Sequence, residues 1–183
     1  MQPKCSVYVA VSVDGFIARA DGDVGWLERP EYSAVSIKGL RYETFMATVD
    51  ALVMGRHTFA KALTFAAWPY ERTPVVVLSN QPLEIPTHIS GTVWHDAGEP
   101  LEIVERLASS GKQHLYIDGG VTIQRFLAAQ LINEITITRM PILLGAGIPL
   151  FGGHIPEQDL QLIDVAVSEN GVVQERFQVK HQG

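Results

Sequence analysis

Residues 50–59, "DALVMGRHTF", join a short apolar run to a glycine and then to a stretch that can form a helix. The run 51–54 is too short for a helix and lies between Asp50 and Gly55, so it predicts a buried strand. A helix over 56–65 would then carry Arg56 and Thr58 in its first turn. A helix N-terminus has unpaired N–H groups and the positive end of a dipole, and it attracts phosphate. The stretch therefore predicts either a phosphate-binding turn or an ordinary strand–helix corner.

The composition is that of an ordinary globular domain. The chain has 183 residues, 46% of them hydrophobic and 19% charged, with a mean hydropathy of +0.12. This length suits one domain over residues 1–183 with a full hydrophobic core, and the composition excludes disorder. No apolar run approaches the roughly 18 residues that a membrane-spanning helix needs.

The net charge and the cysteine content exclude further classes of protein and of binding site. A net charge of -6 argues against a general nucleic-acid binder but is compatible with a local basic pocket for an anionic small molecule. Cys5 is the only cysteine, so neither a disulfide nor a thiolate zinc site can form within one chain. The N-terminal residues lack the pattern of a secretion signal, and we expect a cytoplasmic protein.

Apolar segments and helix-compatible segments alternate along most of the chain. Strands are expected over 5–13, 51–54, 73–80, 91–95, 114–118 and 133–143, helices over 31–49, 56–65, 99–110 and 121–130, and a long loop over 16–30. Residues 160–180 alternate on both sides of Asn170-Gly171, which predicts a β-hairpin with a tight turn. The fold class is therefore a single α/β domain: a mixed sheet of about eight strands flanked by helices, ending in a C-terminal antiparallel hairpin.

Several common kinds of site are excluded by spacing. None of the six histidines forms an HxH or HExxH pattern, so we expect no metal site. The chain has neither a GxSxG elbow nor a GxxxxGK[ST] loop. In "LLGAGIPLFGG" (143–153) the glycines have the wrong spacing for the dinucleotide fingerprint, and Pro149 stands where a helix would begin.

Three predicted strands end in glycine or hydroxyl groups, at 55–58, 79–80 and 118–120. Ligands of open α/β sheets bind at that edge. In order along the chain, the motifs "SVDGFIA" (12–18), "GDVGWL" (22–27), "DALVMGRHTF", "VVVLSN" (75–80), "YIDGG" (116–120) and "ITRMPILLGAG" (137–147) resemble the dihydrofolate reductase-like superfamily. The closest resemblance is to the branch containing the C-terminal reductase domain of the bifunctional riboflavin-biosynthesis deaminase–reductase, and it covers nearly the whole chain.

The resemblance implies that NADPH lies across this sheet edge. The residues implied to hold it are Ala10, Ile17 and Ala18 beside the nicotinamide, Gly55, Arg56 and Thr58 at the phosphates, Ser79 and Asn80 near the adenosine 2′-phosphate, and Gly119, Gly120 and Val121 at the pyrophosphate. Asn80 stands where the family often has a basic residue. A preference for NADPH over NADH would therefore rest mainly on Arg56.

The implied reaction is NADPH-dependent reduction of a C=N bond in a pyrimidine or pterin-type substrate, most like that of 5-amino-6-(5-phosphoribosylamino)uracil reductase. Asp118 is the acidic residue that the riboflavin branch carries before its glycine pair, although it could also be a simple turn former. Glu31 is the candidate of a folate-type enzyme, with Glu43 as a further one. Trp26 and Thr138 are expected at the substrate.

Two alternatives stay open. One is dihydrofolate reductase activity, and the other is a non-catalytic protein that binds a dinucleotide or serves as a scaffold. A homodimer is expected from the resemblance. The basic residues available for a substrate phosphate are sparse, and the candidates are Arg19, Arg29, Arg41 and Arg72.

Overall fold

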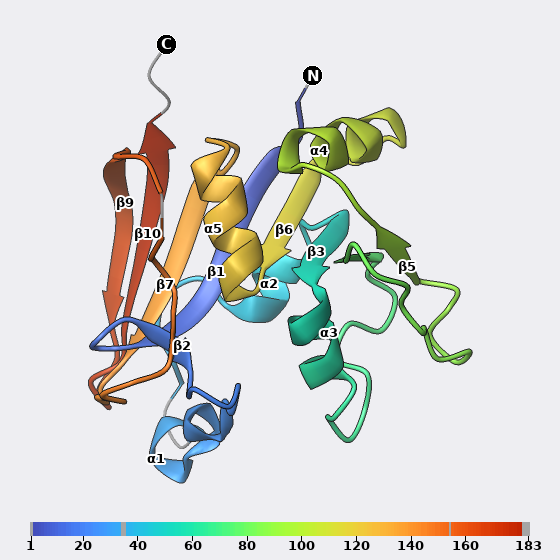
Figure 1. Cartoon of the computed structure of the whole chain (residues 1–183). Helices are drawn as coiled ribbons and strands as arrows, with labels where there is room; N and C mark the ends of the chain where they lie inside the picture. The colour runs from blue at the N-terminus through green and yellow to red at the C-terminus, as the bar shows by residue number, and fades with distance from the viewer. Residues whose placement is uncertain (1, 34–35, 154, 181–183) are drawn as a thin grey trace.

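An eight-stranded sheet runs through the computed structural model, which describes residues 2–33, 36–153 and 155–180. Its strands are β1 (Lys4–Ser12), β3 (Ala51–Gly55), β4 (Val75–Leu78), β5 (Val93–Asp96), β6 (His114–Asp118), β7 (Glu134–Met140), β9 (Asp159–Val167) and β10 (Val173–Lys180). They lie in the order β5-β4-β3-β6-β1-β7-β10-β9, and within this sheet only β10 runs against its neighbours (Figure 1). The expected α/β class and mixed sheet are confirmed.

The central strands are apolar on both faces because helices cover both. On one face Ala51 and Val53 of β3 belong to a core with α4 (Pro100–Ser109) and α5 (Gly120–Ala128). On the other face Leu52 and Met54 pack with α2 (Tyr42–Met46) and α3 (Arg56–Ala62). Figure 1 shows α4 and α5 in front of the sheet and α2 behind it. None of the helices in the described residues is long and apolar enough to span a membrane.

A second, two-stranded sheet lies where a loop was expected. β2 (Phe16–Ala18) pairs with β8 (Ile148–Pro149), and η1 (Gly25–Glu28) and α1 (Pro30–Ser33) follow. A Cβ on Gly147 would collide with the carbonyl oxygen of Ala18, so glycine is needed for this pairing. The Asp14 carboxylate accepts hydrogen bonds from the N–H groups of Leu144 (3.1 Å) and Gly145 (2.7 Å). Two motifs far apart in the sequence thus form one structural unit.

The helix expected over 31–49 was wrong. The structure has two short helices there, α1 and α2, separated by an irregular segment; residues 34–35 lie outside the described part of the chain. Gly39 has a φ of +109°, which is incompatible with a helix. The segment is held instead by the C-terminal strands, since the Lys38 N–H donates to Ser168 Oγ (2.9 Å) and the Leu40 N–H donates to Gln174 Oε1 (2.6 Å).

The expected C-terminal hairpin is formed by β9 and β10. Its loop is 169–171, with the Ser168 N–H donating to the Val172 carbonyl at 2.8 Å and Gly171 at a φ of +82°. A left-handed glycine at this position is typical of three-residue hairpin loops. The hairpin turn predicted at Asn170-Gly171 is therefore confirmed.

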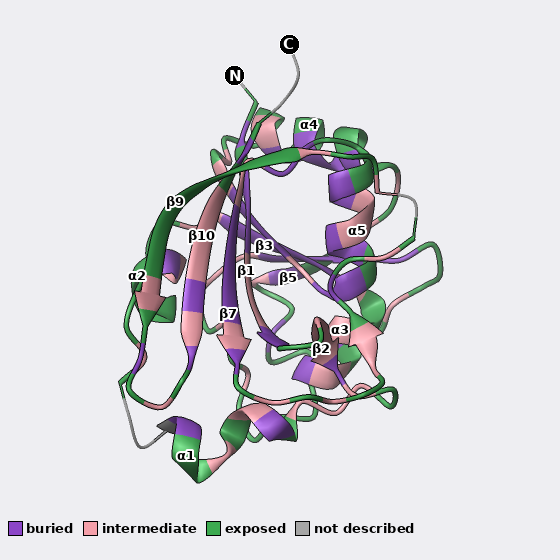
Figure 2. Cartoon of the chain, turned by 90° about the vertical axis from the view of Figure 1, so that its left-hand side faces the viewer, coloured by how far each residue is buried: buried purple, intermediate pink, exposed green. Residues whose placement is uncertain are grey.

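β9 is an edge strand with an unusual apolar surface. The register between β9 and β10 shifts by one residue at a bulge, so that residues 160, 162, 165 and 167 pair with 179, 177, 175 and 173. Because alternate residues of β10 share a face, Leu160, Leu162, Val165 and Val167 all lie on one face of the sheet. Each is at least 43% exposed. Figure 2 shows β9 exposed along most of its length.

Candidate active site

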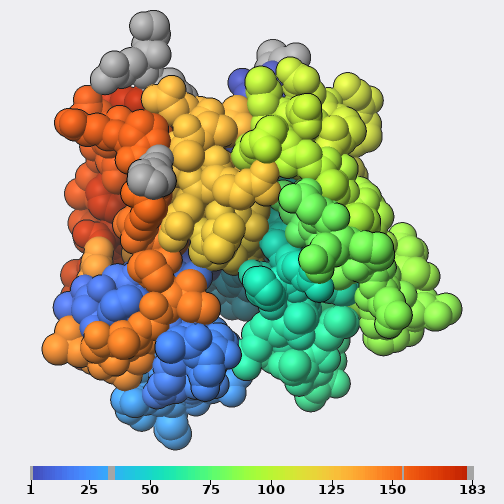
Figure 3. Space-filling model, viewed as in Figure 1, coloured from blue at the N-terminus to red at the C-terminus, as the bar shows by residue number. Residues whose placement is uncertain are grey.

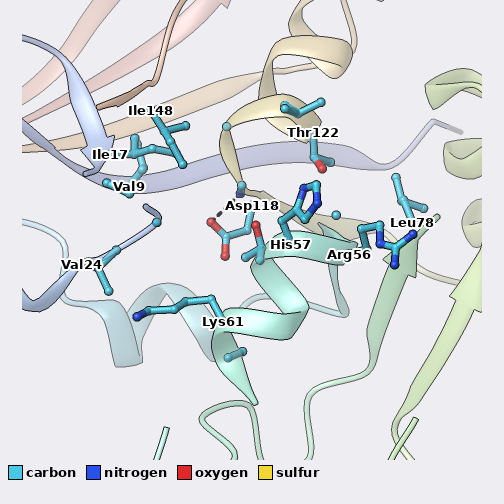
Figure 4. Close-up of a pocket in the computed structure, with 18 of the residues that line it drawn as sticks. Val9, Ile17, Val24, Arg56, His57, Lys61, Leu78, Asp118, Thr122 and Ile148 are labelled. Atoms are coloured by element: carbon cyan, nitrogen blue, oxygen red, sulfur yellow. Dashed lines mark hydrogen bonds between the residues drawn. The ribbon is translucent and has the colours of Figure 1, made fainter. Parts of the chain in front are cut away.

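A cavity of about 600 Å³ opens at the carboxyl ends of β3, β4 and β6. Its walls come from these strand ends, from α3 and α5, and from the β2–β8 pair. Figure 3 shows a hollow between the segments coloured blue, teal and gold, and Figure 4 shows side chains that line it. A volume of this size suits a cofactor-sized ligand.

Two glycines allow the strand–helix turns to interlock. A Cβ on Gly55, at the end of β3, would lie 3.0 Å from Thr122 Oγ1 of α5. A Cβ on Gly119, at the end of β6, would collide with Thr58 Oγ1 of α3. Gly119 also has a φ of +87°, which favours glycine. The two turns therefore fit against each other, and packing between them is one reason for both glycines.

The N-termini of α3 and α5 face the cavity without side-chain caps. Gly55 and Gly119 are their N-cap residues, and neither helix start has a capping hydrogen bond from a side chain. A Cβ on Gly120 would lie 3.0 Å from Ile17 Cδ1 and 3.3 Å from Ile148 Cγ2, so the first turn of α5 is packed closely against the apolar wall. Uncapped N–H groups at the start of α5 are available for an anion.

Three basic side chains line the cavity: Arg56 and Lys61 of α3, and Arg125 of α5. The Arg56 guanidinium donates to the side-chain oxygen of Gln81, and the Ser79 hydroxyl donates to the Gln81 carbonyl at 2.9 Å. Arg125 of α5 donates to the Gly98 carbonyl at 2.9 Å. In Figure 4 Arg56 and Leu78 lie on one side of the cavity, and Ile17 and Val24 on the other. We call the side of Arg56 the basic end; the opposite side is formed by apolar residues together with Lys61, whose side chain extends toward Val24.

Asp118 is the carboxylate of this site. Its carboxylate points into the cavity (Figure 4) and accepts a hydrogen bond from the Gly119 N–H at 2.8 Å. Burial raises the pKa of Asp118 to about 6, although the Gly119 hydrogen bond acts in the opposite direction. A carboxyl group with this pKa exchanges protons near neutral pH, as acid–base groups in active sites do.

All of the residues expected at the cofactor are brought together. Those that line the cavity with Asp118 are Ala10, Ile17, Ala18, Gly55, Arg56, Thr58, Ser79, Asn80, Gly119, Gly120 and Val121. They come from five separate strand ends and helix starts. The parallel strands of the main sheet bring most of them to one edge, and the β2–β8 pair brings Ile17 and Ala18 there.

The expected substrate residues and the second carboxylate lie elsewhere. Trp26 is buried in a core cluster with Tyr32 and Met140, and it does not line the cavity. Thr138 is also buried, and its hydroxyl accepts a hydrogen bond from Gln174 Nε2 at 3.1 Å. Glu31 has an exposed side chain 3.9 Å from Arg29 and is outside the cavity. These three residues therefore lie outside the cavity in which they were expected, because packing between distant segments sets their positions.

The other acidic and basic candidates are also outside the cavity. Arg19 pairs with Asp23, and Arg41 lies 3.6 Å from Glu43. Neither Arg29 nor Arg72 lines the cavity.

Some cavity residues were missed. Lys61 lies on α3 one turn after Thr58, and helical spacing could have identified it. Tyr70 lies in the irregular segment after α3, where no sequence periodicity marks it. Ile148 reaches the cavity through the β2–β8 pairing, which the sequence did not indicate.

Comparisons with known proteins give one family. The family model described as "RibD C-terminal domain" matches residues 3–174. A solved structure from Shewanella sp. PV-4, of a protein assigned to riboflavin biosynthesis, is 38% identical, with a TM-score of 0.86 over 99% of this chain and 100% of that chain.

More distant structures share the fold. The deaminase/5-amino-6-(5-phosphoribosylamino)uracil reductase of Thermotoga maritima is 13% identical, with a TM-score of 0.72; the match covers 98% of this chain and 57% of that one. The dihydrofolate reductase of Enterococcus faecalis, solved with NADP(H), is 16% identical, with a TM-score of 0.66 over 99% of both chains. The dihydrofolate reductase-like fold is therefore confirmed.

Asp118→Asn should stabilise the protein at pH 8. The pKa of Asp118 is about 6 in the folded state, above an unfolded value of about 3.9, so the ionised carboxylate destabilises the native state. Stability of the parent should fall as pH rises from about 4 to 6. We expect the variant to gain about 1–3 kcal/mol at pH 8, because the folded state no longer holds this charge. Urea denaturation without ligands measures this difference.

The gain in stability of Asp118→Asn over the parent should shrink as pH is lowered from 8 towards 4. Asp14→Asn provides a control for carboxylate removal, since hydrogen bonds lower the pKa of Asp14 and its loss should destabilise at pH 8. An Asp118 variant that is less stable than the parent at pH 8 would contradict the assignment of a raised pKa.

Proposed function

The chain belongs to the RibD C-terminal domain family, and on this basis we propose that it is an NADPH-dependent oxidoreductase that reduces a C=N bond in a pyrimidine-type substrate. The observation that carries the proposal is the meeting, in one cavity, of a proton-exchanging carboxyl group and an uncapped helix N-terminus. The first suits the chemistry of the reduction, and the second suits the binding of a dinucleotide phosphate.

The residues of the cavity fit the cofactor. The N–H groups of Gly120 and Val121 begin α5 without a cap and would bind the pyrophosphate. Arg56 at the basic end, with Ser79 and Asn80, would bind the adenosine 2′-phosphate. The apolar wall around Ala10, Ile17 and Ala18 would accommodate the nicotinamide ring. When bound, NADPH would supply the hydride for the reaction.

Asp118 would supply the proton. Reduction of a C=N bond adds a hydride to carbon and a proton to nitrogen. With a pKa of about 6, the Asp118 carboxyl group holds a proton in a minor but usable fraction of molecules at neutral pH.

The substrate is proposed to resemble that of 5-amino-6-(5-phosphoribosylamino)uracil reductase. This activity is part of the name of the Thermotoga maritima protein that shares the fold. Dihydrofolate reductase activity is the weaker alternative, because Glu31, its candidate carboxylate, is exposed outside the cavity. A scaffold without catalysis is the second alternative. NADPH should stabilise the protein by about 2.7 kcal/mol at 100 times its Kd, and no stabilisation would favour the scaffold.

Arg56→Ala should weaken NADPH binding roughly 10- to 100-fold, since a charge-assisted hydrogen bond to phosphate contributes about 1.5–3 kcal/mol. The affinity for NADH, which lacks the 2′-phosphate, should fall less than the affinity for NADPH. Titration calorimetry of both cofactors measures the difference. Arg72→Ala is the matched control, because Arg72 lies outside the cavity. Unchanged affinity of the Arg56 variant for both cofactors would remove Arg56 from the binding site.

Asp118→Asn should lower kcat about 10²-fold or more, because the amide cannot donate a proton as the acid does. The Kd of NADPH should change little. In the parent, a pyrimidine ribosylamine phosphate should be reduced faster than dihydrofolate. The outcome against the assignment is full turnover in Asp118→Asn together with loss of turnover in Glu31→Gln.

We also propose a homodimer that forms through β9. The apolar residues at 160, 162, 165 and 167 cover one face of an edge strand whose outer backbone groups are unpaired within the sheet. Exposed apolar edge strands are usually covered, and a two-fold symmetric contact brings this strand against the same strand of a second copy. A cytoplasmic location is part of the proposal and is consistent with the unpaired, buried Cys5.

Leu162→Glu should convert the dimer into a monomer, since the glutamate would place a charge on the apolar face of β9. Sedimentation equilibrium should give twice the 20.1 kDa chain mass for the parent and 20.1 kDa for the variant. Gln161→Glu is the matched control, because residue 161 lies on the opposite face of the same strand. A monomeric parent, or a dimeric and folded Leu162 variant, would refute this interface.

A further inference from the structure

Tyr42, Tyr70 and Tyr116 lie close enough to Asp118 for its charge to raise their pKa values, and Tyr8 lines the same cavity. Two of their hydroxyl groups have structural partners, since Tyr8 donates to the Leu40 carbonyl at 2.7 Å and Tyr116 donates to the Tyr8 carbonyl at 2.7 Å. Among the described residues, the hydroxyl groups of Tyr42 and Tyr70 have no hydrogen-bond partner. Of these two, only Tyr70 lines the cavity.

The ring of Tyr70 is held by aromatic packing. It lies edge-on to Trp68, with ring centroids 5.0 Å apart and an interplanar angle of 81°. Trp68 in turn lies 5.8 Å from the buried ring of Phe59 on α3, at 76°. The position of Tyr70 is therefore tied to the helix that forms one wall of the cavity.

The backbone around Tyr70 forms a strained turn. The Thr73 N–H donates to the Tyr70 carbonyl at 2.7 Å, and Glu71 within this turn has a φ of +38°. A residue other than glycine adopts such a φ at a cost, and strain of this kind gathers at functional sites. The turn and the aromatic packing together hold one side chain at the cavity.

The phenol of Tyr70 acts as a neutral group. Burial raises its pKa, and the charges of Asp118 and Tyr42 raise it further. Tyr70 is therefore protonated at physiological pH and can donate a hydrogen bond to a ligand acceptor. Asp118, when ionised, accepts hydrogen bonds from a ligand donor. Val24, Leu27 and Phe65 line the same cavity and offer apolar surface to a planar ring.

We propose that Tyr70 is a substrate-binding residue whose hydroxyl group donates a hydrogen bond to a ring carbonyl of a planar heterocycle, while Asp118 accepts one from a ring N–H. Together they recognise the carbonyl and N–H groups of a pyrimidinone ring. The proposal rests on the proposed function in taking the Asp118 end of the cavity as the place of the substrate. It adds the residue that selects for carbonyl groups on the ring.

The test is binding of 5,6-diaminouracil to protein saturated with NADP⁺, measured by calorimetry at pH 8. Tyr70→Phe keeps the ring that packs on Trp68 and removes only the hydroxyl group. We expect it to weaken binding about 10-fold, the effect of losing one hydrogen bond of roughly 1.4 kcal/mol. Tyr42→Phe is the matched control, since it removes a hydroxyl group outside the cavity, and it should leave the Kd unchanged.

A second ligand separates a direct contact from a structural effect. In 2,4,5,6-tetraaminopyrimidine amino groups replace both ring carbonyls, so Tyr70→Phe should not weaken its binding. Four results would each overturn the proposal. Tyr70→Phe could lose equal affinity for both ligands, or lose no affinity for 5,6-diaminouracil. The affinity could instead fall in Tyr42→Phe, or the parent could fail to bind 5,6-diaminouracil at all.

These results are independent of turnover. A parent that binds 5,6-diaminouracil through Tyr70 but reduces no substrate would refute the proposed reductase activity and support this inference. A parent that reduces a pyrimidine substrate, with kcat/KM unchanged in Tyr70→Phe, would overturn this inference alone.

Discussion

The reciprocal fit of two glycines and two threonines is the constraint on which the cavity depends. Gly55 leaves space for Thr122, and Gly119 leaves space for Thr58. Because neither glycine can carry a Cβ without displacing its threonine, the turns after β3 and β6 are held side by side. The starts of α3 and α5 then converge on one point without side-chain caps. The edge at which we propose that phosphate binds therefore follows from packing between two turns, and not from either turn alone.

Asp118 lowers the stability of the folded state at this edge of the sheet. It directly follows the apolar residues of β6, and burial raises its pKa to about 6. A carboxyl group in this position opposes folding when it ionises, yet it has the proton affinity that acid–base chemistry requires. The turn at Glu71, with its left-handed φ beside Tyr70, is a second place where backbone strain accompanies a cavity residue. At these two points the native state holds features that cost stability beside residues for which we propose a function.

The two ends of the cavity differ in how they are built. The basic end uses residues close in sequence to strand ends, such as Arg56 after β3 and Ser79 after β4. The other end is assembled from the β2–β8 pair, from α3 and from the loop that carries Tyr70. The two ends therefore depend on different parts of the fold: one on the ends of sheet strands, and the other on the β2–β8 pair and a loop.

By itself, the sequence determined the strands of the main sheet, the hairpin at Asn170-Gly171 and the group of residues at the sheet edge. These depend on local signals: apolar runs, breakers, and glycines directly after strands. It did not indicate that Glu31, Trp26 and Thr138 lie outside the cavity, or that Tyr70 lines it. Gln174 and Ser168 hold the segment near Gly39 out of a helix, and Gly147 admits the β2–β8 pairing. Such contacts join residues more than a hundred positions apart. Only the tertiary structure decided them, because their energy comes from packing and hydrogen bonds that no local pattern encodes.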